Sequence, residues 1–424
     1  MRDATAARRA ALAILRDVSV GTPFGAARDA RVAGLADRDR RLAHELAAGV
    51  LRRRRDLDGA LPIDRADARL HDILRLGAYQ LRWLTRVPPH AAVSTSVELA
   101  RETAGEGAAK YVNQALRRVG EEGRGKGEGE SHPEWLVRRW TKRFGAAATT
   151  QLLAWNDTKP AITLQPARWD ADTLGPRLAS AGYRIAPAPF GTGLQLLGVG
   201  TTPHTPRLPD LPGYSEGAFI VQDPAHALVC RFAGLAAGAR VFDACAAPGG
   251  KSVTLERLGA RVTAGDARRE RLARLAETTR RAGVAIRLVC ADLEAAPFAA
   301  ATWDAVLVDA PCTATGTLAR HPDARWRLNA AAIGRAAARQ RRLLAAGAAL
   351  VRRGGLLIYA TCSLEAEENT DVVEDFLTRN PEFTRAPAPG AVPDALRTPA
   401  GDFQTLPHRD GVDGAYAARL VRVR

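Results

Sequence analysis

The sequence predicts a multidomain protein with an all-α N-terminal domain over residues 1–120, a small α+β module over 131–205 and an α/β doubly wound domain over 206–424. Three observations support this division. Apolar residues recur at helical spacing in the first part, the stretch 121–130 is polar and glycine-rich, and short apolar runs alternate with helical patterns from about residue 215 onward. Such alternation indicates a parallel sheet with helices on both faces.

Helical periodicity is clear near the N-terminus, where apolar residues recur every three or four positions. The residues that show it are Ala11, Leu12, Ile14, Leu15, Val18, Leu42, Leu46, Val50 and Leu51. Residues 121–130 (EEGRGKGEGE) lack periodicity, and we expect them to form a flexible linker. The module that follows is expected to combine two helical stretches with short strands over 161–164 and 193–197.

The C-terminal part alternates strand and helix. The expected strands, each a short apolar run, are 240–244, 261–265, 286–290, 304–308 and 355–360. The expected helices are 251–258, 268–282 and 331–351. Ligands of such sheets bind at the carboxyl ends of the strands, so the residues that directly follow each strand are the candidates for a site.

The composition is that of a globular protein with a marked positive charge. The 424 residues are 46% hydrophobic, and 61 Lys+Arg against 46 Asp+Glu give a net charge of +15. This excess favours a polyanionic partner such as nucleic acid, although a bias toward arginine or a need for solubility gives the same count. Five scattered cysteines without C-x-x-C pairs argue against a disulfide framework or a zinc site. Without a run of about 18 apolar residues, we expect a cytoplasmic protein and no membrane span.

A glycine-rich loop, DACAAPGGKS over residues 243–252, joins the first strand of this sheet to its helix. Its glycines let a ligand approach the backbone, and the N-terminus of the helix offers N–H groups and a positive dipole. We expect the loop to bind a nucleotide-like cofactor. The alternative is a phosphate-binding P-loop, because Gly250-Lys251-Ser252 matches the end of G-x-x-x-x-G-K-[ST]; however, Cys245 stands where that motif requires its first glycine.

Two carboxylates follow the next two strands. Asp266 lies about 20 residues after the loop, where an acidic residue typically accepts hydrogen bonds from a ribose. Asp292 ends the third strand, where its carboxylate can meet the amino group of an adenine. Each residue also fits a structural role as the cap of the helix or turn that follows.

Two cysteines follow two further strands. Cys312 lies in the sequence DAPC, three residues after Asp309, and Cys362 lies in the sequence ATCS. Two thiols delivered to one crevice suit an enzyme that adds a thiolate to an electrophilic ring, with Asp309 placed to protonate or hydrogen-bond that ring. Free cysteines are more often small buried residues, and we expect that packing role for Cys230, Cys245 and Cys290.

Five long motifs stand in the C-terminal part: EGAFIVQDP (216–224), DACAAPGGKS (243–252), DAPCTATG (309–316), YATCSLEAEEN (359–369) and LPHRDGVDG (406–414). Together they resemble the Nop/Sun family of RNA cytosine-C5 methyltransferases. The resemblance implies a Rossmann-like domain with S-adenosylmethionine as methyl donor. It implies Cys362 as the nucleophile that adds to C6 of cytosine and Cys312 as the residue that aids release, with Lys251 and Asp309 completing the catalytic set. The implied cofactor-binding residues are Cys245, Ala246, Ala247, Pro248, Gly249, Gly250, Lys251, Asp266, Asp292 and Asp309.

The N-terminal part carries the motifs LGAYQ (76–80), VPPHAAV (87–93) and KYVNQALRR (110–118). They resemble a NusB-like helical domain, whose fusion to the catalytic domain implies the branch of the family that acts on 16S ribosomal RNA. We therefore expect residues 1–120 to bind RNA, with Arg52–Arg55 as a candidate phosphate patch. The protein is expected to act as a monomer on ribosomal RNA before the subunit is fully assembled.

Two departures from the family stand beside this resemblance. Leu164-Gln165-Pro166-Ala167 replaces a usual Arg-Val-Asn and bears on RNA contacts of the second module, and Ala415-Tyr416 stands where relatives tend to have aromatic residues. Three alternatives remain open: a P-loop nucleotide hydrolase, an RNA-binding antitermination factor without enzymatic activity, and a family member that acts on transfer RNA. ATP turnover, RNA binding that ignores the cofactor, or methylated transfer RNA would identify each of them.

Overall fold

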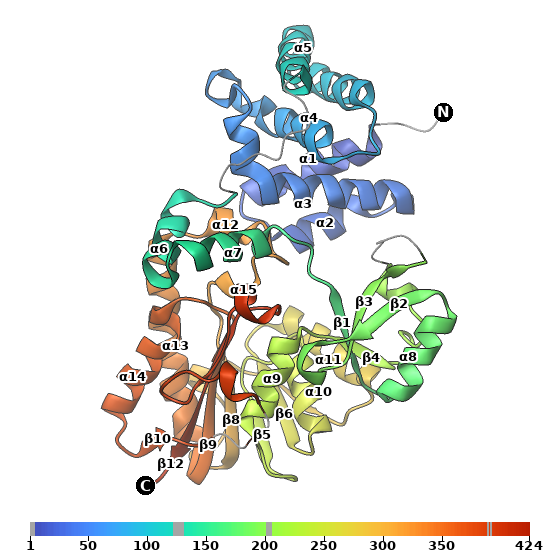
Figure 1. Cartoon of the computed structure of the whole chain (residues 1–424). Coiled ribbons are helices and arrows are strands. Elements are labelled where there is room, and N and C mark those ends of the chain that lie inside the picture. Colours follow the sequence, from blue (N-terminus) through green and yellow to red (C-terminus); the bar gives the residue numbers. More distant parts are fainter. Residues whose placement is uncertain (1–4, 122–130, 201–205, 388–389, 391) are drawn as a thin grey trace. The chain divides into compact units, whose positions relative to one another are not determined.

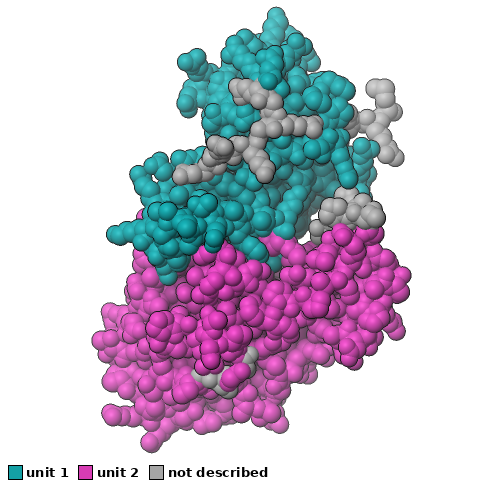
Figure 2. Space-filling view, in the orientation of Figure 1, with its two compact units in different colours: residues 1–159, 318–327 teal, residues 160–317, 328–424 magenta. Residues whose placement is uncertain are grey.

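The computed structural model describes residues 5–121, 131–200, 206–387, 390 and 392–424 (Figure 1). The chain divides into two compact units (Figure 2). Unit 1 comprises residues 1–159 and 318–327, and unit 2 comprises residues 160–317 and 328–424. The linker expected over 121–130 lies outside the described residues, apart from Glu121 at the end of a helix.

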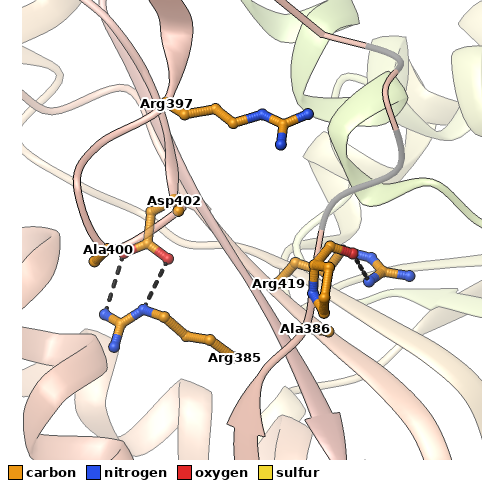
Figure 3. A pocket seen from close by; sticks show the side chains of 8 residues that line it. Arg385, Ala386, Arg397, Ala400, Asp402 and Arg419 are labelled. Carbon is orange, nitrogen blue, oxygen red and sulfur yellow. Dashed lines mark hydrogen bonds and ion pairs between the residues drawn. The ribbon is translucent and has the colours of Figure 1, made fainter. Parts of the chain in front are cut away.

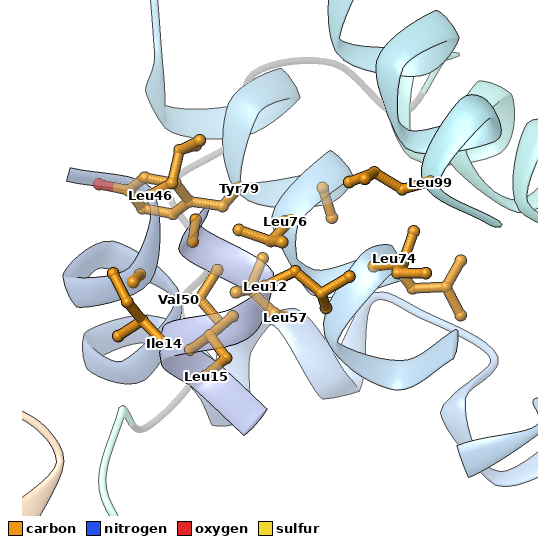
Figure 4. Packing of buried hydrophobic residues seen from close by; sticks show 14 of the residues in the cluster. Leu12, Ile14, Leu15, Leu46, Val50, Leu57, Leu74, Leu76, Tyr79 and Leu99 are labelled. Atoms are coloured by element: carbon orange, nitrogen blue, oxygen red, sulfur yellow. The ribbon is translucent and has the colours of Figure 1, made fainter. Parts of the chain in front are cut away.

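Unit 1 is helical. Its helices are α1 (Ala6–Ser19), α2 (Phe24–Val32), α3 (Asp37–Gly59), α4 (His71–Trp83), α5 (Pro89–Glu121), α6 (Glu134–Phe144), α7 (Ala146–Asn156) and the short α12 (Ala324–Arg327). The predicted apolar faces meet in its core, where Ile14 and Leu15 of α1 belong to one cluster with Leu46 and Val50 of α3 (Figure 4). Each such side chain stabilises the fold by about 1.5–3 kcal/mol when fully buried. The prediction of an all-α N-terminal part is confirmed.

Unit 2 begins with a small antiparallel sheet in the order β2-β3-β1-β4. Its strands are β1 (Ile162–Pro166), β2 (Tyr183–Pro187), β3 (Leu194–Val199) and β4 (Phe219–Val221), and α8 (Ala171–Ser180) accompanies them. Leu174 and Leu178 of α8 pack with Leu164, Leu196 and Phe219 from three of the strands. This apolar cluster makes the sheet and its helix one small layered element.

The boundaries expected for this module, 131–205, differ from the structure in two ways. Helices α6 and α7 belong to unit 1, and the sheet takes its fourth strand from beyond the expected end. Long-range pairing is the cause in both cases. Asp157, directly after α7, forms an ion pair with Arg53 of α3 at 2.8 Å, and β4 pairs with β1 through Gln165 and Ile220.

The main sheet of unit 2 has the order β10-β12-β9-β8-β5-β6-β7, and β11 pairs with β12. Its strands are β5 (Arg240–Asp243), β6 (Arg261–Asp266), β7 (Arg287–Cys290), β8 (Trp303–Asp309), β9 (Val351–Thr361), β10 (Phe383–Arg385), β11 (Phe403–Thr405) and β12 (Ala415–Arg422). Its helices are α9 (Pro224–Ala233), α10 (Gly250–Arg257), α11 (Arg269–Ala282), α13 (Ala330–Leu350), α14 (Thr370–Arg379) and α15 (Pro407–Asp410). Strands β5 to β9 are parallel as predicted, whereas β10, β11 and β12 form an antiparallel part that the sequence did not predict.

Apolar clusters cover both faces of the main sheet, which confirms the doubly wound, Rossmann-like prediction. Because neighbouring residues of a strand point to opposite faces, β8 contributes to both clusters. Ala305 and Leu307 pack on the side of α9, α10 and α11, while Val306 and Val308 pack on the side of α13 and α14. In the part of the chain that the structure describes, no helix has the length and apolar character needed to cross a membrane.

Candidate active site

The glycine-rich loop joins β5 to α10 at the carboxyl ends of the parallel strands of the main sheet. The Ala246 N–H donates to the Gly265 carbonyl at 2.8 Å and so ties the loop to the end of β6. Gly249 has a φ of +108°, and a Cβ there would lie 2.6 Å from Leu275 Cδ1. Only glycine fits this turn, which presents backbone to a ligand directly before the first turn of α10.

Asp266 offers an acceptor for a ribose hydroxyl. It is the last residue of β6, is 3% exposed and accepts a hydrogen bond from the Arg268 N–H at 3.0 Å. Its other oxygen, Oδ2, makes no hydrogen bond with the described residues, and Arg271 Nη1 lies 3.4 Å from it. A buried acceptor without a hydrogen bond is costly, and the hydroxyl of a bound ribose would satisfy it. The carboxylate therefore fits the adenosine part of a cofactor.

Asp292 follows the neighbouring strand β7. Strands β6 and β7 are in register with Asp266 opposite Cys290, so Asp292 extends beyond the same edge of the sheet. Its Oδ1 accepts a hydrogen bond from the Glu294 N–H at 3.1 Å. The capping role that the sequence allowed is present and occupies one carboxylate oxygen.

Asp243, which is fully buried, and Cys245, which is partly buried, lie at the start of the loop. Burial raises the pKa of Asp243 to about 7, and Ser252 Oγ donates to its Oδ2 at 2.6 Å. Burial raises the pKa of Cys245 to about 12, with the carboxylates of Asp309, Asp243 and Asp266 acting in the same direction. Cys245 is therefore a neutral thiol, and the charges of all three carboxylates reach it.

Lys251 links the loop to Asp309. Its Nζ lies 2.7 Å from Asp309 Oδ2 and 3.0 Å from Nδ1 of His226 in α9. Burial alone would lower the pKa of Lys251, but the Asp309 carboxylate and the charge of Cys362 raise it above its ordinary value. The structure thus brings two predicted residues into direct contact and adds His226, which the sequence analysis missed although it lies two residues after the motif that ends at Pro224.

The two cysteine sulfurs lie 3.3 Å apart. Register explains the contact, because Asp309 at the end of β8 is opposite Ala360 near the end of β9, and each cysteine follows its strand. The hydrogen bond to Cys362, burial, and the charges of Cys362 and Glu368 raise the pKa of Cys312 well above its ordinary value. Cys312 is therefore a protonated thiol in contact with the sulfur of Cys362, and either sulfur can be the donor of this hydrogen bond.

Glu368 joins the two cysteine loops and was not among the predicted site residues. It is fully buried, and its carboxylate accepts hydrogen bonds from the Thr313 N–H at 2.9 Å and from Ser363 Oγ at 2.7 Å. The hydroxyl of Thr313 also donates to it. Thr313 follows Cys312 and Ser363 follows Cys362, so one carboxylate fixes the residue next to each sulfur. The only sequence signal was its place in the acidic end of the YATCSLEAEEN motif.

Gly316 closes the Cys312 loop against two other segments. Its N–H donates to the Cys362 carbonyl at 2.9 Å, and its carbonyl accepts from the Gly414 N–H at 2.8 Å. A Cβ at Gly316 would lie 2.6 Å from the Gly414 carbonyl oxygen and 2.8 Å from that of Cys362. The loop therefore requires glycine here, and LPHRDGVDG, the motif that ends at Gly414, takes part in the site through its backbone.

The phosphate patch expected at Arg52–Arg55 stays a prediction, and the structure shows that these side chains make contacts within unit 1. Arg52 is 8% exposed, and none of the other three is fully exposed. Their partners are the Ala319 carbonyl for Arg52, Asp157 for Arg53, the Trp326 ring for Arg54 and the His132 carbonyl for Arg55. Arg52 is therefore buried away from a ligand, whereas Arg53, Arg54 and Arg55 are partly exposed.

The two departures from the family lie in packed positions. Leu164–Ala167 includes the end of β1, where Leu164, Gln165 and Pro166 pair with β4. Tyr416 is opposite Thr361 in register, and its hydroxyl donates to Asp402 Oδ2 at 2.6 Å. The second departure therefore bears on packing one residue from Cys362.

A pocket lined by arginines lies beside β10 and β12 (Figure 3). It is lined by Arg385, Ala386, Pro387, Arg397, Ala400, Gly401, Asp402 and Arg419. Arg385 Nε donates to Asp402 Oδ1 at 3.1 Å, so part of its charge is already paired. None of these lining residues is a predicted site residue, and the pocket is separate from the two cysteines in sequence and in lining.

Comparison with known proteins identifies two family matches. A family model described as 16S rRNA methyltransferase RsmB/F matches residues 234–421, and the NusB family model matches residues 5–121. Both parts of the resemblance found in the sequence are therefore confirmed.

Similar proteins cover almost the whole chain. A protein of Synechocystis sp. named probable ribosomal RNA small subunit methyltransferase B is 34% identical over 98% of this chain and 99% of its own length. The ribosomal RNA small subunit methyltransferase B of Xylella fastidiosa is 37% identical over 98% of this chain and 99% of its own. The solved structure of PH0851 is similar with a TM-score of 0.80 and 22% identity over 99% of both chains, which is a similarity of fold.

Proposed function

We propose that this chain, which belongs to the RsmB/F family of 16S rRNA methyltransferases, methylates C5 of a cytosine through a transient bond between Cys362 and C6 of the base. The chain is an enzyme that methylates ribosomal RNA of the small subunit, and its cofactor is S-adenosylmethionine. The observation that carries the finer proposal is the 3.3 Å separation of the Cys312 and Cys362 sulfurs at the carboxyl ends of two parallel strands.

The proposed cofactor site is the loop from Cys245 to Lys251 together with three carboxylates. Asp266 Oδ2 accepts from the ribose, which its buried and unsatisfied oxygen favours. Asp292 extends beyond the neighbouring strand toward the adenine, and Asp309 borders the opposite side of the loop. When bound, S-adenosylmethionine supplies an electrophilic methyl group.

Cys362 is the proposed nucleophile. In this proposal its sulfur accepts the hydrogen bond of the Cys312 thiol, which lies 3.3 Å away, and the Lys251 ammonium interacts favourably with its negative charge. The thiolate is the reactive form of a cysteine. The thiolate forms a bond to C6, and the electron pair of the C5=C6 bond makes C5 nucleophilic toward the methyl group.

Asp309 and Lys251 are proposed to act on the cytosine ring as a pair. Lys251 holds a proton 2.7 Å from Asp309 Oδ2, so a base that contacts Asp309 meets a group that can deliver a proton to N3. Protonation of N3 neutralises the negative charge that the thiolate brings into the ring when it adds to C6. The pair therefore lowers the barrier to formation of the S–C6 bond.

Cys312 is proposed to assist release after methyl transfer. Once Cys362 is bonded to C6, the hydrogen bond and the charge of Cys362 that raised the pKa of Cys312 are gone. Its thiol can then lose its proton to water, and the thiolate takes the proton from C5. The electron pair of that C–H bond restores the C5=C6 bond and expels Cys362 as a thiolate, and N3 returns its proton to the pair of Asp309 and Lys251.

The test of the two roles is a denaturing gel of the enzyme with 16S rRNA and S-adenosylmethionine. We expect Cys312→Ser to leave a covalent RNA–protein species, Cys362→Ser to leave none, and Cys290→Ser, at an exposed cysteine, to behave like the unaltered enzyme. A species trapped only by Cys362→Ser would show that the roles are reversed, and its absence in both variants would contradict covalent catalysis.

The proposed substrate is a cytosine that has left its stack, because the ring must meet a thiol and a methyl donor on its faces. Such a base is accessible in 16S rRNA before the subunit is complete, in the reducing cytoplasm where free thiols persist. We propose that the enzyme acts there as a monomer. Mapping 5-methylcytosine in 16S and transfer RNA from cells with and without the protein tests the substrate, and methylation lost from transfer RNA alone would contradict it.

A further inference from the structure

Residues 318–327, which lie between the two cysteine motifs in sequence, belong to unit 1. The chain passes out of unit 2 after Thr317 and returns to it at Leu328. Leu318 and Arg325 are fully buried, and Asp323 is 2% exposed. A connection over a protein surface is normally exposed, so this burial marks an anchored segment. We call residues 318–327 the tether.

Arg325 makes several of the polar contacts of the tether. Its guanidinium donates to Asp157 Oδ1 at 3.1 Å, to the Asn156 carbonyl at 2.9 Å and to the Arg52 carbonyl at 3.3 Å. Burial lowers the pKa of Arg325 to about 10, which leaves it charged at neutral pH. One side chain thus connects the tether with α3 and with the end of α7. Removing the partner of a buried charge costs several kcal/mol of stability. These contacts therefore specify one position for the tether.

Trp326 and Asp323 add a second contact with α3 and a contact with one further helix, α2. Trp326 packs against the apolar core of unit 1, and its Nε1 donates to the Leu51 carbonyl at 2.6 Å. Asp323 Oδ2 accepts from the N–H of Phe24, the first residue of α2, at 3.2 Å. The segment is therefore held by α2, α3 and α7 together.

Both ends of the tether continue into the candidate active site. Before it, the Cys312 loop runs directly from Cys312 through Gly316 to Leu318. After it comes α13, whose Gln340 donates to the Pro311 carbonyl at 3.0 Å and to Glu368 at 2.9 Å. A shift of the anchor would pull on the loop at one end and on the Glu368 network at the other.

We propose that the tether lets the N-terminal helical unit position Cys312, and that Arg325 is the positioning residue that fixes it. The inference rests on the proposed role of Cys312 in release. It assigns the N-terminal unit a part in turnover, beyond the binding of RNA. Displacement of a catalytic group by about 1 Å can cost on the order of 100-fold in rate, so a loosened tether should slow release.

The test compares Arg325→Met with Arg75→Met in steady-state and single-turnover methylation of 16S rRNA. Arg75 is a matched control, because it is a buried arginine of unit 1, 6% exposed, whose ion pairs with Asp58 and Asp72 do not include the tether. We expect Arg325→Met to lower kcat about tenfold or more, to leave KM for RNA within about twofold, and to increase the gel-stable adduct. Arg325→Lys should recover part of kcat, since an ammonium can serve some of the same acceptors.

Two outcomes would overturn the proposal: equal kcat for the Arg325→Met and Arg75→Met variants, or a change confined to KM. If Arg325→Met does not fold, Trp326→Phe replaces it, because that variant removes the hydrogen bond to the Leu51 carbonyl and keeps an aromatic ring in the core and beside Arg54; unchanged kcat in it overturns the proposal. Absence of an adduct in the Cys312→Ser variant contradicts the proposed function and not the role of the tether. In that case the separate effects of Arg325→Met on kcat and on KM still test whether the tether positions Cys312.

Discussion

At the residue scale, the site depends on which buried groups keep their protons. Cys312, Cys245 and Asp243 all have pKa values raised by their surroundings, whereas Lys251 keeps its charge beside Asp309. Neutral groups therefore lie beside a charged pair within one site. Cys362 contacts the Cys312 thiol, and its charge interacts with the ammonium of Lys251.

Asp243 makes stability depend on pH. Its folded pKa of about 7 exceeds its ordinary value of 3.8, so the folded state binds more protons than the unfolded state between these values, and stability falls as the pH rises through this window. Asp243→Asn should reduce the loss of unfolding free energy between pH 5 and pH 8 by about 1 kcal/mol or more in urea titrations. Asp304→Asn is the control, because the hydrogen bond from Arg352 lowers the pKa of Asp304 and leaves it ionised in both states above pH 5. An equal pH dependence in the Asp243→Asn variant and the unaltered protein would refute this.

Glu368 should matter for activity although it touches no substrate in the proposed mechanism. Glu368→Gln replaces an acceptor of the Thr313 and Ser363 hydrogen bonds by an amide that donates on one side. We expect a loss of about 1–3 kcal/mol in unfolding free energy and a fall in kcat with little change in KM for S-adenosylmethionine. Asp371→Asn, at an exposed position, serves as control. A variant with normal kcat would show that the cysteine loops hold their positions without this carboxylate.

At the scale of elements, the Cys312 loop is fixed by close backbone contacts. Gly316→Ala would place a Cβ 2.6 Å from the Gly414 carbonyl oxygen, so we expect a loss of about 1–3 kcal/mol and of most methylation activity. Gly334→Ala is the matched control, because a Cβ at Gly334 in α13 meets nothing within 4 Å and alanine favours a helix by up to about 1 kcal/mol. Thermal unfolding and initial methylation rates of the two variants check this. Equal stability and equal rates in both would show that the Cys312 loop does not require glycine at position 316.

Some strands and site residues could be predicted from the sequence, and others could not. Strands β5, β6, β8 and β9 were predicted because buried parallel strands are short apolar runs, and β7 was predicted from its run of apolar residues although most of them are exposed. Strand β12 was missed, because AYAARLVR mixes buried alanines with arginines and has neither alternation nor a run. Glu368 was missed because an acidic run normally faces solvent, and its burial depends on Thr313, 55 positions away.

That α6 and α7 belong to unit 1 could not be predicted from the sequence, for a similar reason. Their partner is the tether, which enters unit 1 from a position more than 160 residues further along the chain. The same segment contacts Arg52 and Arg54 of the expected phosphate patch, which local periodicity did not indicate. Local periodicity carries no information about such contacts, whereas the two cysteines, the loop and Asp309 were predicted because each directly follows a recognisable strand.

At the scale of the whole molecule, the net charge of +15 should govern RNA affinity. Phosphate contacts release counterions, so we expect the affinity for 16S rRNA to fall at least about tenfold between 50 and 200 mM salt. The Cys362→Ser variant should show the same salt dependence, because binding precedes the chemistry. Filter binding measures both, and an affinity independent of salt would contradict an electrostatic mode of binding.

The central claim is that the Cys362 sulfur forms the bond to C6 of cytosine. Its most direct test is mass spectrometry of the adduct that Cys312→Ser leaves on 16S rRNA, after digestion with protease and nuclease. We expect the nucleotide on the peptide that contains Cys362. A nucleotide on any other peptide, or no nucleotide on any peptide, would contradict a covalent bond between Cys362 and cytosine.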